Sequence, residues 1–134
     1  MGKRWLFFFL ITCFSLHACT NLSGESTEES IGIIGNPTAE DILSNDKNAD
    51  IFNAHGVIYS KAVNIEWVSE QELVLGEKLL EIKQHTINSK DFEHGSATKL
   101  PIGTKIYKPK NGTGPILIAV LDGKKVNYIG LIEG

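Results

Sequence analysis

The sequence predicts a mainly β fold, a small antiparallel barrel or roll with one or two short helices, preceded by a flexible tether. Two observations support this prediction. From Asp50 onward, β-branched and aromatic residues occur in short runs separated by turn residues, as is typical of small β domains. Between Thr20 and Ala49, six acidic residues and one lysine lie in a polar stretch that offers little apolar surface to bury.

Strands are expected where apolar residues alternate with polar ones or form short uninterrupted runs. The predicted strand segments are residues 51–60, 63–68, 76–84, 99–108, 116–121 and 126–131. Asp122-Gly123 separates the last two and favours a tight hairpin, because this pair readily takes the positive backbone angles of a two-residue turn. Residues 76–84 also fit one face of a helix, and a strand is the preferred interpretation. Residues 85–97 are polar and are expected to form an exposed loop.

Two helix starts are visible in the sequence. Thr38 is placed to cap a helix whose first turn contains Glu40 and Asp41, and the alternative is that this segment only extends the linker. The segment 69–72 reads Ser-Glu-Gln-Glu, a capping-box pattern that precedes a short apolar run and predicts a short helix or a turn. The first helix would lie inside the tether, and the second would lie inside the β domain.

Aromatic residues are expected to form the core of the β domain and its rim. Along residues 63–68, Val63, Ile65 and Trp67 alternate with Asn64, Glu66 and Val68, which predicts a strand with one buried face. The predicted core and rim aromatics are Trp67, Phe52, Tyr59, Tyr107 and Tyr128.

The N-terminus has the layout of an export signal. Lys3 and Arg4 precede an apolar-to-neutral run from Trp5 to Leu16, and small residues follow. This run is shorter than the roughly 18 to 20 residues that a permanent membrane-spanning helix needs. The predicted organisation is therefore a signal peptide over residues 1–18, an acidic polar tether with a short helix over 19–49, and a β domain over 50–134.

The end of the apolar run, Leu16-His17-Ala18-Cys19, resembles the lipobox of bacterial lipoproteins. Leu16, Ala18 and Cys19 match the pattern, whereas His17 departs from the small or hydroxylated residue usual at its position. The resemblance implies a diacylglyceryl group on the thiol of Cys19 and cleavage just before it. The alternative is an ordinary secretory signal with Ala18 at the cleavage site. Residues 67–134 also loosely resemble small uncharacterised lipoproteins of Gram-positive bacteria, a likeness that implies no activity.

The expected function is that of a membrane-anchored extracytoplasmic lipoprotein, a tethered module that binds an envelope protein or a wall polymer. The chain is acidic overall, with a formal net charge of −3, and is expected to be exported, which argues against nucleic acid as a partner. A monomer without cofactor, metal or catalytic activity is expected.

An alternative function is a small envelope hydrolase or a metal-handling lipoprotein. Its candidate residues are His85, Asp91 and His94, because imidazole and carboxylate groups bind transition metals. Their spacing matches no standard ligand pattern.

Charge is unevenly distributed within the β domain. Residues 50–98 contain eight acids and four lysines, and residues 99–134 contain six lysines and two acids. One interpretation is that the lysines gather on a face that meets an anionic polymer, lipid headgroups or an acidic partner. The other, which is preferred, is that the two segments pair across the sheet and neutralise each other.

Overall fold

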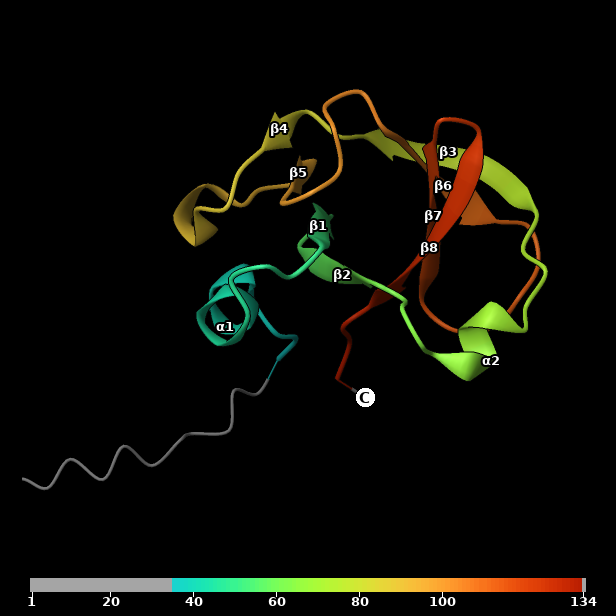
Figure 1. Cartoon of the computed structure of the whole chain (residues 1–134), viewed down its shortest axis with the longest axis horizontal. Coiled ribbons are helices and arrows are strands. Elements are labelled where there is room, and N and C mark those ends of the chain that lie inside the picture. Colours follow the sequence, from blue (N-terminus) through green and yellow to red (C-terminus); the bar gives the residue numbers. More distant parts are fainter. Residues whose placement is uncertain (1–34, 134) are drawn as a thin grey trace, which may run out of the picture. The chain divides into compact units, whose positions relative to one another are not determined.

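The computed structural model describes residues 35–133. The predicted signal peptide, Cys19 and most of the predicted tether lie outside these residues. The described part is mainly β, as predicted, with one sheet that curls into a half-barrel and two short helices (Figure 1). Its elements are α1 (Ala39–Asn45), β1 (Ile51–Ala54), β2 (Val57–Lys61), α2 (Glu66–Ser69), β3 (Leu75–Glu81), β4 (Gln84–His85), the 3-10 turn η1 (Ser89–Asp91), β5 (Ser96–Ala97), β6 (Lys105–Pro109), β7 (Ile116–Leu121) and β8 (Lys124–Gly130).

The strands follow the order β3-β6-β7-β8-β2-β1-β5-β4 across the sheet. Neighbouring strands are antiparallel, as predicted, except that β4 runs parallel to β5. The predicted hairpin at Asp122-Gly123 is confirmed, since both residues have positive φ values, 48° and 75°, between β7 and β8. A second such turn, His55-Gly56 with φ values of 52° and 84°, divides the predicted segment 51–60 into β1 and β2.

Apolar clusters lie on both faces of the sheet. The larger cluster surrounds Phe52 and Tyr128, which are completely buried. The ring of Phe52 stacks on Tyr59 with centroids 5.3 Å apart and meets the edge of Tyr128 at 5.0 Å. The opposite face carries a smaller cluster, formed by Val68, Leu73, Ile116 and Ile118. The prediction that Phe52, Tyr59 and Tyr128 belong to the core and its rim is confirmed.

The predicted helix start at Thr38 is also confirmed. The Thr38 hydroxyl accepts a hydrogen bond from the backbone N–H of Asp41 at 3.2 Å, and the Asp41 carboxylate accepts one from the N–H of Thr38 at 2.8 Å. The Thr38 hydroxyl also donates to the Asp41 carboxylate at 2.6 Å, and this bond together with that from the N–H of Thr38 holds the pKa of Asp41 below its usual value. Ala39 and Leu43 of α1 are buried against Ile51 and its neighbours, so this helix packs on the domain and is not an extension of the linker.

The predicted strand over residues 63–68 is wrong. The chain leaves the extended conformation at Asn64, whose φ is 59°, and then forms the single turn α2. Val68 of this turn is buried on the sheet, whereas Trp67 is 44% exposed and is not a core residue. The alternation of apolar residues was therefore misleading, because one helical turn can bury Ile65 and Val68 while it leaves Trp67 at the surface.

Of the two possibilities predicted for residues 69–72, the helix start is wrong and the turn is observed at Glu70. Ser69 is the last residue of α2, and its hydroxyl donates to the carbonyl of Glu66 at 2.8 Å. The preferred interpretation of residues 76–84 as a strand is confirmed by β3. Among residues 35–133, the structure has no helix both long and apolar enough to cross a membrane.

Candidate functional site

The three residues of the alternative hydrolase or metal site do not form a cluster. His85 is exposed on β4, and Asp91 lies in η1, where its carboxylate accepts a hydrogen bond from the side chain of Asn88 at 3.0 Å. Within residues 35–133, no group of three or more His, Cys, Asp or Glu side chains is placed to hold a metal ion. The geometry therefore gives the alternative function no support.

His94 instead contacts His55, on the turn between β1 and β2. The ring centroids are 4.3 Å apart, and the backbone N–H of His55 donates to Nδ1 of His94 at 2.9 Å. Nδ1 therefore carries no proton, and neutral His94 is protonated at Nε2. Metal binding at Nε2 would move that proton to Nδ1 and break the hydrogen bond. The contact disfavours a metal ligand role and links two loops that are 39 residues apart in the sequence.

This contact predicts a pH dependence of stability. Partial desolvation lowers the pKa of His94, and the nearby His55 and Lys83 lower it further. The unfolded chain therefore takes up the proton first as the pH falls, so the stabilisation is complete above pH 6.5 and is lost as the pH falls through the pKa of folded His94. We expect a loss of about 0.5 kcal/mol, because the contact is exposed to solvent.

The measurement is urea unfolding between pH 7.5 and 5 for the wild type, His94→Gln and His85→Gln. The His85 variant should keep the wild-type pH dependence, and the His94 variant should have a flatter one. An NMR titration in which folded His94 has a pKa at or above 6.5 would contradict the assignment.

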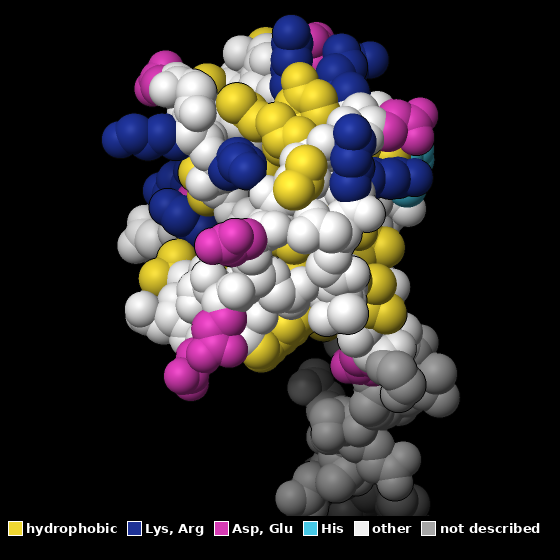
Figure 2. All heavy atoms as spheres, turned by 90° about the vertical axis from the view of Figure 1, so that its right-hand side faces the viewer, with side chains coloured by type: hydrophobic (Ala, Val, Ile, Leu, Met, Phe, Trp, Pro, Cys, Tyr) yellow, Lys and Arg dark blue, Asp and Glu magenta, His cyan; other side chains and the backbone are white. Residues whose placement is uncertain are grey.

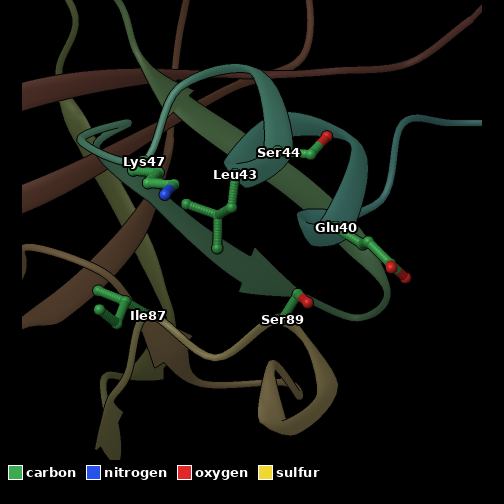
Figure 3. Close-up of a pocket in the computed structure, with 6 residues that line it drawn as sticks. All are labelled: Glu40, Leu43, Ser44, Lys47, Ile87 and Ser89. Atoms are coloured by element: carbon green, nitrogen blue, oxygen red, sulfur yellow. The ribbon is translucent and has the colours of Figure 1, made fainter.

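An open pocket of about 340 Å³ lies beside α1 (Figure 3). Leu43 points into it from the helix, Ile87 approaches from the segment before η1, and Ser89 approaches from the first position of η1. Glu40 lines it from the first turn of α1, and Lys47 lines it from just beyond the end of this helix. The pocket thus combines an apolar floor with one group of each charge, which does not specify a class of ligand.

The outer face of β3, β6, β7 and β8 presents a more specific arrangement. Pairing of the strands places residues side by side in rows that cross the sheet. The first row, next to the β7–β8 turn, contains Glu81, Lys105, Val120 and Lys125. The second row contains Lys78, Tyr107, Ile118 and Asn127. We call the five residues Lys78, Lys105, Tyr107, Val120 and Lys125 the lysine face.

The far end of this outer face is covered by the segment that contains α2. Val68 and Leu73 from this segment pack on Ile116 and on Ile118 of the second row, and all four side chains are buried. Apart from Ile118, the first two rows remain open, with exposed lysines beside the partly buried Tyr107 and Val120. Figure 2 views this side of the molecule and shows apolar side chains with lysines around them in its upper half.

The lysine face is cationic although the whole chain is acidic. Its three lysines face one acid in the same rows, Glu81, which gives a local charge of +2. Nζ of Lys78 lies 3.4 Å from the carboxylate of Glu81, and both side chains are nearly half exposed, so this ion pair is weak. Nζ of Lys125 donates to the carbonyl of Leu73 at 2.8 Å, a neutral acceptor that leaves its charge uncompensated.

The lysines of residues 99–134 and the acids of residues 50–98 are not joined by ion pairs in the described part of the chain, although Glu81 lies opposite Lys105 in the sheet. The preferred prediction of mutual neutralisation is therefore not supported by direct pairing. Lys105 and Lys125 of the C-terminal segment share one face with Lys78 of β3. The numbers of acids and lysines in residues 50–98 and 99–134 did not indicate that Lys78 joins them.

No protein-family model, curated protein or solved structure matches this chain.

Proposed function

We propose that this chain is a bacterial lipoprotein whose folded domain is a tethered binding module of the cell envelope. The observation that carries the anchoring is the apolar run that ends in Leu16, Ala18 and Cys19. Cleavage before Cys19 and transfer of a diacylglyceryl group to its thiol would leave two acyl chains on one residue. Two chains anchor a protein stably, whereas a single myristoyl-sized chain binds a membrane only reversibly, at about 10⁴ per molar.

The described domain supports binding in preference to catalysis. Burial raises the pKa of Tyr128, and the hydrogen bond that its hydroxyl donates to Asp50 at 2.8 Å raises it further, so this tyrosine remains neutral. Asp41 is committed to the cap of α1, and His94 contacts the turn at His55. Each of these perturbed groups has a structural partner, and the lysine face presents charge directly to solvent. The proposed role of the domain is to hold an anionic envelope component close to the membrane.

The anchoring is tested by expressing the wild type in a bacterial host beside Cys19→Ala and the matched control Cys13→Ala. Cys13 lies within the apolar run and would be removed with the signal peptide, so its replacement should have no effect on the mature protein. We expect the wild type and the Cys13 variant to lose residues 1–18, gain a diacylglyceryl mass and fractionate with the membrane. The Cys19 variant should keep residues 1–18 and carry no lipid.

Intact mass spectrometry and membrane fractionation give the result. A wild type that is cut after Ala18 and released without lipid would overturn the proposed anchoring and favour an ordinary secretory signal. Equal behaviour of the wild type and Cys19→Ala would also exclude lipid attachment at this cysteine.

A further inference from the structure

We propose that the lysine face binds a linear anionic polymer with phosphate groups repeated along its chain. This inference rests on the proposed function, which places the domain in the cell envelope, where such a polymer would occur. The binding itself is argued from the geometry of the sheet. It assigns the open rows of the outer face to one class of ligand.

Charge supports an anionic ligand. A local charge of +2 on a chain of net charge −3 attracts anions to this face. The segment that borders the face has the opposite character, because α2 and the residues after it contain Glu66, Glu70 and Glu72. An anionic polymer is therefore attracted to the rows near the β7–β8 turn and repelled from the end of the face near α2.

The spread of the lysines favours a polymer over a single small anion. Lys105 and Lys125 lie on β6 and β8, two strands apart, and so are separated by roughly 10 Å. The ammonium groups of Lys78 and Lys125 are held by different partners, Glu81 and the carbonyl of Leu73. They therefore do not converge on one point. A chain with repeated phosphates can meet the lysines in turn.

The apolar residues of the face argue against a lipid surface. Proteins that bind bilayers through a peripheral face bury exposed apolar side chains among the headgroups. Here Ile118 is completely buried, and Tyr107 and Val120 are partly buried, so each exposes only part of its side chain. The exposed Trp67 lies on α2 beside Glu66, where anionic lipid is repelled. Tyr107 instead offers a ring and a hydroxyl to the carbon chain and hydroxyl groups of a polyol phosphate.

The binding is tested by calorimetry with the full chain in neutral detergent and a synthetic poly(glycerol phosphate) as the probe. We expect the wild type to bind the polymer with an affinity that falls as salt is added. The triple variant Lys78→Gln, Lys105→Gln and Lys125→Gln should bind about 10- to 100-fold more weakly and with a smaller salt dependence. Replacement of the same three lysines by arginine should preserve binding.

A control variant with the same change in charge is Lys47→Gln, Lys61→Gln and Lys90→Gln, three exposed lysines outside the face. It should bind the polymer within about twofold of the wild type, because charges beyond the contact are largely screened. The proposal is overturned if the wild type does not bind, or if the control variant loses as much affinity as the triple variant. If the triple variant fails to fold, Lys105→Glu alone should still weaken binding severalfold, and unchanged affinity would overturn the proposal.

Labelling of lysine amines, read by mass spectrometry, separates the polymer from a lipid ligand. The polymer should protect Lys78, Lys105 and Lys125 in neutral micelles. Phosphatidylglycerol added to the micelles without polymer should leave them reactive, and protection by this lipid alone would overturn the proposal in favour of a membrane surface. Because the assay does not depend on Cys19, failure of polymer binding and failure of lipid anchoring are distinguishable.

Discussion

Phe52→Ala should lower the free energy of unfolding by about 3–5 kcal/mol. Phe52 is completely buried at the centre of the main cluster, where its ring stacks on Tyr59 and meets the edge of Tyr128. Truncation removes buried apolar area and both aromatic contacts, and leaves a cavity between them. Domains of this size have a total stability of about 5–15 kcal/mol, so the variant should lose a large share of it.

Urea unfolding followed by circular dichroism measures the effect. The control is Ile87→Ala, because Ile87 is 69% exposed and its truncation should change stability by less than about 0.5 kcal/mol. A Phe52 variant that stays within about 1 kcal/mol of the wild type would mean that the cluster around Tyr128 is not the main core.

Thr98→Val should destabilise the domain by about 2–3 kcal/mol, the second large effect. Thr98 is 2% exposed, and its hydroxyl accepts from the N–H of Ile51 at 3.0 Å and donates to the carbonyl of Ala49 at 2.6 Å. The Thr98 hydroxyl thereby bonds the backbone groups of Ile51 and Ala49 that a neighbouring strand would otherwise bond, at the point where the pairing of β1 with β5 ends. Valine has nearly the same shape but leaves the buried N–H of Ile51 without an acceptor.

Thr98→Ser is the matched control for that variant. Serine keeps the hydroxyl and loses only a methyl group, so its cost should be about 1 kcal/mol. Amide hydrogen exchange of Ile51 gives an independent reading, since its N–H should exchange faster in Thr98→Val and stay protected in Thr98→Ser. Equal stability of the two variants would show that the hydrogen bonds at this site contribute nothing.

The fold could be predicted from sequence where local chemistry decides the conformation. Asp122-Gly123 determines a hairpin because both residues tolerate positive φ, and Thr38 determines a helix start because its hydroxyl can bond Asp41. The prediction failed at Trp67, where tertiary packing overrides the pattern. The adjacent sheet face buries Val68 in a single helical turn, and an alternating sequence of six residues cannot distinguish this turn from a strand.

The candidate site could be predicted only in part. Lys105 and Tyr107 alternate with the buried Ile106, so the sequence already places both side chains on one face of a strand. Lys78 could not be assigned to that face, because two register shifts interrupt the pairing of β3 with β6, and each shift reverses the side on which a residue lies. The His55–His94 contact could not be predicted either, since it joins two loops whose proximity depends on the complete sheet.

The two ends of the sheet also affect how copies of this chain behave when they are crowded. An edge strand exposes unpaired backbone groups and can recruit the edge of another molecule, which leads to aggregation. At one edge β4 has only two residues, and at the other β3 is irregular and carries Glu77, Lys78 and Glu81. Short length, bulges and charge each hinder edge-to-edge pairing. The arrangement thus hinders the growth of the sheet from one copy into the next, and this would matter most for the proposed membrane-anchored chain, whose copies are confined to one plane.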